Sequence, residues 1–278
     1  MTSRIEKSHQ QIHAKTDAAR DRLGRAVVPL LAFTNADRPE GIGSGVLLSV
    51  PPHFFLLTAA HVIEGDHRAL FMGKDGQLVP LSKRCLLWPK PTGDHKGADI
   101  AVRGLEPLEF TPFGRDRFLT LRDTLPGSAG TRGGDLLILG HPKNKVKVSL
   151  TSSLVEHPLF AYCAPTVTDA ELSDIGYDSD MHLGMAFRQK DSIRNGHRTT
   201  APVPEGLSGA PLFGFNSLRS DSESDPLVGI ATTWRKATPE CIIGTDIGIA
   251  LALIYDAFPE CDEAFAVDGR SAAASNDS

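Results

Sequence analysis

The sequence predicts an all-β protein made of two antiparallel β-barrels of six strands each, preceded by one N-terminal helix. Short apolar, β-branched runs recur along most of the 278-residue chain, and glycine, proline and asparagine separate them. Runs of this length at regular spacing are typical of barrels and sandwiches. They fall into two sets on either side of the loop-rich residues 104–132, and two six-stranded barrels account for both sets.

The helix is expected over residues 4–23, outside the barrels. Ser3 followed by Glu6 forms a capping-box pattern, and Gly24 offers a stop. The narrow apolar stripe of this helix suits packing on the body of the protein. The alternative is self-association or binding to a regulatory partner, and it stays open.

Changes in residue composition divide the chain into four expected regions. The N-terminal helix takes residues 1–25, the first barrel 26–120, the second barrel 121–263, and a disordered tail 264–278. The expected strands are 26–33, 41–50, 54–60, 68–73, 83–88 and 99–103 in the first barrel, and 134–140, 146–152, 158–164, 181–188, 210–214, 227–233 and 246–252 in the second.

Composition and charge exclude several kinds of partner. The net charge of −5 comes without a long basic run, so neither nucleic acid nor an anionic membrane is expected. The N-terminus lacks the apolar segment of a signal peptide, and no run reaches the eighteen apolar residues of a membrane span. Four scattered cysteines are too few for a disulfide framework. A cytoplasmic protein is the expectation.

A serine between glycines marks the stretch on which the function depends, residues 204–213. Glycine permits the backbone angles of a tight turn, so Ser208 can present its hydroxyl at the edge of such a turn. The amides of Gly206 and Ser208 can then point at one spot and form an oxyanion hole, in which each donor is worth roughly 3 kcal/mol of barrier.

Two upstream motifs supply what a serine nucleophile needs. His61 ends the motif Thr58-Ala59-Ala60-His61, and Asp99 enters the apolar run Asp99-Ile100-Ala101-Val102. An imidazole must take the serine proton, and a carboxylate must fix the tautomer of the imidazole. We therefore expect a catalytic triad of His61, Asp99 and Ser208.

These three motifs, in this order, resemble the trypsin-like (chymotrypsin-fold) serine peptidases. The resemblance covers about residues 26–258 and is closest to the bacterial, disulfide-free branch that includes the high-temperature-requirement proteases, here without a PDZ module. It implies a serine endopeptidase that cleaves protein or peptide substrates through an acyl-enzyme. It also implies that the first barrel supplies His61 and Asp99 and the second supplies Ser208.

Other kinds of site fit less well. The pattern around Ser208 also resembles the nucleophile elbow of α/β-hydrolases, but their histidine follows the serine, and no histidine follows Ser208. The stretch 41–45 has three glycines but precedes a strand and lacks the Gly-Lys-Ser/Thr of a phosphate loop, so we interpret it as a strand-entry loop. No metal-binding motif occurs, and no cofactor is expected.

The resemblance also assigns a specificity pocket. Its base is Pro202, its walls come from expected strands at 231–234 and 248–250, and Thr232 stands where a hydroxyl commonly supports the triad aspartate. An uncharged pocket favours an uncharged residue before the cut, because burying an unpaired Lys or Arg costs several kcal/mol. The pocket residues are Pro202, Thr232, Thr233, Trp234, Gly248 and Ala250.

The sequence departs from the digestive enzymes of the family at Leu207. Those enzymes carry an aspartate there, which pairs with a new N-terminus after cleavage. Packing, substrate or a regulatory partner must therefore set the oxyanion loop here. A second hypothesis is a catalytically silent binding or scaffold protein that keeps the peptidase fold.

Overall fold

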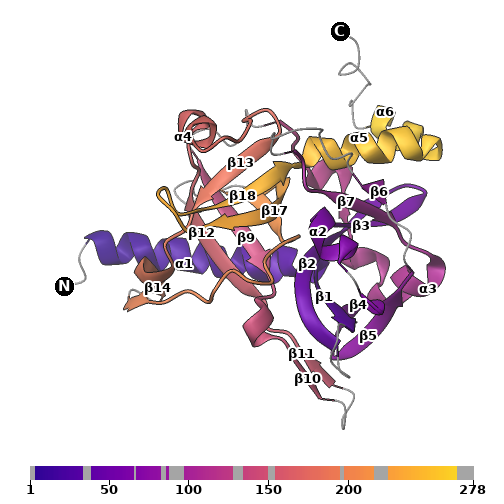
Figure 1. The fold of residues 1–278 in the computed structure, drawn as a ribbon, viewed down its shortest axis with the longest axis horizontal. Coiled ribbons are helices and arrows are strands. Elements are labelled where there is room, and N and C mark those ends of the chain that lie inside the picture. Colours follow the sequence, from indigo (N-terminus) through magenta and orange to yellow (C-terminus); the bar gives the residue numbers. More distant parts are fainter. Residues whose placement is uncertain are drawn as a thin grey trace.

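The computed structural model describes residues 4–33, 39–65, 67–82, 86–87, 97–127, 134–149, 154–194, 197–215 and 225–267. Most of the tail expected at 264–278 lies outside these ranges, as does most of the strand expected at 83–88. Two curled antiparallel sheets and an N-terminal helix make up the fold, and the predicted all-β architecture is confirmed (Figure 1).

The first sheet has eight strands in the described part of the chain. Their order is β5-β4-β1-β2-β3-β7-β6, and β8 pairs with β2 in parallel. β6 and β8 have two residues each, so six longer strands form the body of the sheet. The strands are β1 (Val27–Phe33), β2 (Pro39–Val50), β3 (His53–Thr58), β4 (Ala69–Lys74), β5 (Gln77–Leu81), β6 (Leu86–Leu87), β7 (Ala101–Gly104) and β8 (Leu119–Thr120).

The second sheet has six strands in the order β12-β9-β16-β17-β18-β13. They are β9 (Asp135–Gly140), β12 (Phe160–Pro165), β13 (His182–Ala186), β16 (Pro211–Phe215), β17 (Leu227–Arg235) and β18 (Cys241–Asp246). Two short hairpins accompany this sheet: β10 (Lys147–Ser149) with β11 (Leu154–Glu156), and β14 (Ser192–Arg194) with β15 (His197–Thr199).

Helices join and cover the sheets. The α-helices are α1 (Arg4–Leu23), α2 (Ala60–Glu64), α3 (Pro107–Phe110), α4 (Asp169–Asp174), α5 (Ile247–Ala257) and α6 (Asp262–Val267). Short 3₁₀ turns are η1 (Gly24–Ala26), η2 (Thr111–Phe113), η3 (Arg115–Arg117), η4 (Leu121–Asp123), η6 (Lys143–Lys145), η7 (Gln189–Asp191) and η8 (Pro259–Cys261). Within the described ranges, no helix combines the length and apolar character needed to cross a bilayer.

The strand expected over residues 246–252 is wrong, because this segment begins α5. The Asp246 carboxylate accepts a hydrogen bond from the Gly248 amide at 2.7 Å and so caps the helix. Apolar residues then recur at helical spacing and face the core, as at Ile247, Leu251 and Ile254. The strand that pairs with β17 is β18, which the sequence analysis missed.

The expected tail begins too early. Residues 264–267 belong to α6, and Phe265 is buried in the same core as both sheets. Burying an aromatic side chain contributes roughly 2–3 kcal/mol, which holds this turn of helix in place.

Three of the four cysteines are described, and all three are free thiols. Cys241 and Cys261 are buried and Cys163 is half-buried, whereas Cys85 lies outside the described residues. Burial raises the pKa of Cys163, and it raises the pKa of Cys261 to about 11. Thiolate reactivity at these two sites is therefore low.

The C-terminal half of α1 packs on the body of the protein. In Figure 1 the helix passes behind the second sheet, where it contacts β12, and it ends where β1 begins. Ala19 and Leu23 are buried in the core that both sheets share, and Arg22 forms an ion pair with the buried Asp225. This part of the helix is thus a component of the β fold and not a separate arm.

We expect Leu23→Ala to lower the free energy of unfolding by about 2–5 kcal/mol, because it leaves a cavity in the shared core. Urea unfolding of the full chain measures this change. Gln11→Ala, at an exposed position of the same helix, is the matched control and should change stability by less than about 0.5 kcal/mol. Equal effects of the two variants would contradict the packing of α1.

Candidate active site

His61 is presented by the first turn after a buried strand. β3 is apolar and buried up to Thr58, and α2 begins at Ala60, so the chain turns at the point where His61 emerges. Thr58 donates its hydroxyl to the Ser44 carbonyl at 2.7 Å, and Val62 is buried in the first-sheet core. These contacts hold α2 while the His61 side chain stays half exposed.

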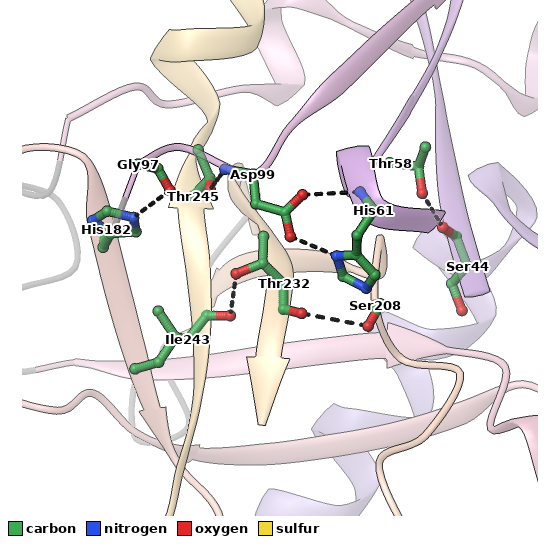
Figure 2. A network of polar contacts seen from close by, with 10 residues as sticks. All are labelled: Ser44, Thr58, His61, Gly97, Asp99, His182, Ser208, Thr232, Ile243 and Thr245. Carbon is green, nitrogen blue, oxygen red and sulfur yellow. Dashed lines mark hydrogen bonds and ion pairs between the residues drawn. The ribbon is translucent and has the colours of Figure 1, made fainter. Parts of the chain in front are cut away.

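Asp99 faces His61 with both carboxylate oxygens. Oδ1 accepts from the His61 backbone amide at 3.0 Å, and Oδ2 lies 2.5 Å from Nδ1 of the ring (Figure 2). Burial of Asp99 raises its pKa, but the hydrogen bond and positive charge of His61 outweigh this and lower the pKa below its usual value. The carboxylate is therefore ionised at neutral pH and favours the tautomer with its proton on Nδ1.

Ser208 lies on the Nε2 side of the same ring. Figure 2 shows it beyond the imidazole from Asp99, with its hydroxyl donating to the Thr232 carbonyl at 3.4 Å. In the described part of the chain Ser208 has no hydrogen bond to His61. Serine rotamers interconvert readily, so rotation about χ1 can redirect the hydroxyl.

The loop before Ser208 is held with two amides free. The Glu205 carbonyl accepts from the Lys143 amide at 2.7 Å, and the Leu207 carbonyl accepts from the Ala210 amide at 2.9 Å. In a planar trans peptide the next N–H points opposite to the carbonyl. The amides of Gly206 and Ser208 therefore point away from these partners, and neither donates to another described residue.

Positive φ angles explain the two glycines around Ser208. Gly206 has φ of 92° and Gly209 has φ of 83°, in the region that side chains avoid. A Cβ at Gly206 would also lie 2.4 Å from the Lys143 amide, and one at Gly209 would lie 2.0 Å from the Ser44 carbonyl oxygen. Only glycine fits at either position.

Ser44, which the sequence analysis missed, connects the two halves of the site. It lies in the glycine-rich stretch interpreted as a strand-entry loop, which is in fact part of β2. Its amide donates to the Ser208 carbonyl at 2.8 Å, and its hydroxyl donates to the Gly206 carbonyl at 2.9 Å. A fully buried side chain of the first sheet thus holds the loop of the second that carries Gly206 and Ser208.

The residues assigned to the specificity pocket are only partly brought together. Thr232, Thr233 and Trp234 lie on β17, and Pro202 lies in the loop that leads to Ser208. Gly248 and Ala250 lie on α5, and Ala250 is fully buried in the shared core, so their placement on a strand wall is wrong. β18 takes that place, with Ile242 opposite Trp234.

Two further details differ from the expectation for this pocket. The Thr232 hydroxyl donates to the Ile243 carbonyl at 3.2 Å and does not support Asp99. The apolar cluster that contains Leu207 and Ala231 also contains Phe187, which is fully buried and packs edge-on against Trp234. Nothing in the sequence marked Phe187, because its position depends on how distant strands pair.

No protein-family model and no curated protein matches the sequence. Solved structures do match. A serine endoprotease from Yersinia pestis has 20% identity and a TM-score of 0.49, over 87% of this chain and 67% of that one. The thermostable serine protease AL20 from an extremophilic microorganism has 14% identity and a TM-score of 0.52, over 85% and 97%.

Neuropsin, a serine protease expressed in mouse brain, has 16% identity and a TM-score of 0.50, over 84% of this chain and 94% of that one. Identities this low establish similarity of fold alone. The chain therefore has the fold of trypsin-like serine proteases. Within the described residues, histidine, cysteine and acidic side chains do not gather in groups that could hold a metal ion.

A buried histidine lies directly behind the oxyanion loop. His141 follows β9, and its amide donates to the Ser44 hydroxyl at 2.9 Å. Its ring is only 3% exposed and packs edge-on against His157. Burial, together with the positive charge of His157, lowers the pKa of His141 to about 4, so the ring is neutral in the folded protein.

We expect acid to weaken the fold through His141. The unfolded chain binds a proton at this histidine below about pH 6.5, whereas the folded protein does so only near pH 4, so stability is lost as pH falls through this window. The loss should reach about 3 kcal/mol at pH 4. Urea unfolding at pH 7 and pH 4 measures it, and His141→Phe should lose correspondingly less. An identical pH dependence in both proteins would contradict this role.

Proposed function

We propose that this chain is a serine endopeptidase that cleaves protein substrates through Ser208, His61 and Asp99. The observation that carries the proposal is the 2.5 Å contact of His61 Nδ1 with Asp99, which directs Nε2 toward Ser208. The free amides of Gly206 and Ser208 support it, because a binding protein has no need for two unpaired donors beside a serine.

In the proposed mechanism, substrate binding turns the Ser208 hydroxyl from the Thr232 carbonyl to Nε2 of His61. His61 takes the proton as Oγ attacks the peptide carbonyl, and the amides of Gly206 and Ser208 stabilise the oxyanion. His61 then protonates the leaving amine, and an acyl-enzyme remains on Ser208. Water, activated by His61, hydrolyses this ester and restores the hydroxyl.

We propose that the oxyanion loop already has its active conformation in the uncleaved chain, so that no activating cleavage is needed. Leu207 stands where the digestive enzymes of the family carry an aspartate, and it is buried against Gly140. Packing of this apolar side chain takes the place of an ion pair in fixing the loop. We propose that the protein belongs with the bacterial, disulfide-free, cytoplasmic enzymes of this fold and that a partner protein regulates access to the site.

We expect a fluorophosphonate probe to label the wild-type chain at Ser208. In assays with a peptide that the wild type cleaves, Ser208→Ala and His61→Ala should each lower kcat by as much as ~10⁶, and Asp99→Asn by about 10⁴. The losses are this large because the three residues act as one unit. Combining Ser208→Ala with His61→Ala should add little. Labelling that persists in Ser208→Ala would contradict the assignment.

The alternative is a scaffold that holds peptides without cutting them. The observation in its favour is the hydrogen bond of the Ser208 hydroxyl to Thr232 and not to His61. Peptide binding without labelling at Ser208 would support the scaffold, whereas labelling would exclude it.

The proposed specificity is for small or medium uncharged residues before the cut. Apolar side chains cluster in the expected pocket region, where the Phe187 ring packs edge-on against Trp234 of β17. Pro202 adds no charge, and Lys236 stacks over the Trp234 ring at 4.5 Å.

Profiling with a peptide library should show cleavage after residues such as Ala, Val or Leu, because an aliphatic side chain gains roughly 2 kcal/mol on burial. Trp234→Gly should extend the preference to larger side chains by opening the pocket. Thr124→Val, a buried substitution on the segment between the sheets, serves as the control for indirect effects. A dominant preference for Lys or Arg in the wild type would contradict the pocket.

A further inference from the structure

The segment that carries Asp99 has little support from its own sheet. Residues 97–100 form no strand, and β7 begins only at Ala101. Both carboxylate oxygens of Asp99 are engaged by His61, so the side chain does not anchor the segment elsewhere. Ile100 anchors the end of this segment in the shared core, and the backbone at Gly97 and Asp99 has further partners.

Two side chains of the second sheet hold it. The Asp99 amide donates to Oγ1 of Thr245 at 3.3 Å, and the Gly97 carbonyl lies 3.4 Å from Nε2 of His182 (Figure 2). His182 on β13 and Thr245 on β18 are directly paired across the two strands. This pair of neighbouring residues thus holds the Asp99 segment at two backbone groups, the Gly97 carbonyl and the Asp99 amide.

The His182 ring is itself fixed. It is only 3% exposed, its Nδ1 lies 3.0 Å from the Asp178 carbonyl, and the Tyr177 ring packs edge-on against it at 5.1 Å. Both ring nitrogens face carbonyl oxygens, which only accept hydrogen bonds, whereas a neutral imidazole carries a single N–H. In the tautomer with this proton on Nε2 the ring donates to the Gly97 carbonyl, and burial together with the Tyr177 contact fixes the orientation of the ring.

We propose that His182 is a positioning residue for Asp99: it donates its Nε2–H to the Gly97 carbonyl and so fastens the aspartate segment to the second sheet. This inference rests on the proposed function. His182 touches no reacting atom and acts through the backbone that carries Asp99. The carboxylate in turn sets the tautomer and orientation of His61, and a displacement of about 1 Å in such a group can cost 10²-fold in rate.

The position of His182 also links the two sheets across the active site. His61 and Asp99 come from the first sheet, whereas Ser208, His182 and Thr245 come from the second. If the sheets shifted relative to one another, the Asp99 segment would follow the sheet that carries Ser208. The contacts of His182 and Thr245 therefore keep Asp99 in a fixed position relative to Ser208.

The test measures fluorophosphonate labelling of the full chain at increasing probe concentration, which separates the maximal rate of bond formation from the probe concentration that gives half of it. We expect His182→Phe, which keeps an aromatic ring and removes the N–H donor, to lower the maximal rate by about 10- to 100-fold while leaving the half-saturating concentration unchanged. His182→Gln, whose amide N–H can reach the Gly97 carbonyl, should recover most of the rate.

Thr245→Val removes the second contact and should act in the same direction. Because both side chains hold one segment, the loss in His182→Phe/Thr245→Val should be smaller than the product of the two single losses. His53→Phe is the matched control: this histidine lies on β3, pairs with Glu260 and packs at a tilt against the Phe258 ring, away from the triad. It should label at the wild-type rate.

Melting temperatures of all variants identify a purely structural effect. If His182→Phe does not fold, His182→Met supplies a second side chain without donors for comparison with His182→Gln. An unchanged rate in the donor-free variant, or equal losses in the donor-free and Gln variants, would overturn the inference. A wild-type chain that is not labelled at Ser208 would instead overturn the proposed function.

Discussion

The site depends on the contacts of one buried serine, Ser44, at the boundary between the two sheets. The serine lies on β2, yet its amide and hydroxyl bind the carbonyls of Ser208 and Gly206 from the other sheet. Its own carbonyl accepts the hydroxyl of Thr58, three residues before His61. A single backbone position thus fixes the approach to the histidine and the turn of the nucleophile together, and a change there would disturb both.

Packing reinforces this arrangement from behind. Leu207 is buried next to Ser208, so the turn around Ser208 is anchored by an apolar side chain and by backbone hydrogen bonds. Buried hydrogen bonds are costly to break, since each unpaired group keeps its desolvation penalty of about 1–3 kcal/mol. The free amides of Gly206 and Ser208 are the exceptions, and they face the place where a substrate carbonyl would lie in the proposed mechanism.

Sequence reasoning succeeded where the signal is local. The strands around His61 and Ser208 were predicted because short apolar runs ended by turn residues describe them, and the architecture of two β-sheets followed. It failed at residues 246–252, because the run from Ile247 to Leu253 is apolar enough for a strand or a helix, and only the cap by Asp246 decides for the helix. That error displaced the expected pocket wall from β18 to α5.

The partners of the triad segment could not be found from the sequence at all. His182 and Thr245 are 63 positions apart, and they meet only because β13 and β18 pair with that register. Phe187, directly after β13, and Ser44 on β2 carry no motif either, since residues of these types occur throughout such a fold. The proposed chemistry resides in short motifs, whereas the geometry that aligns these motifs resides in long-range pairing.

The burial of α1 bears on the order in which the protein can become folded. Arg22 pairs with Asp225, 203 positions later, and Leu23 shares a core with Phe265 of α6. As the chain leaves the ribosome, the first helix is made long before the C-terminal residues that pack on it. Until then its apolar face is exposed to water or bound by a chaperone. Closing such distant contacts late is slow, and the interval exposes the growing chain to aggregation. The helix that completes the core therefore exposes part of its apolar face until the C-terminal residues of that core have been made.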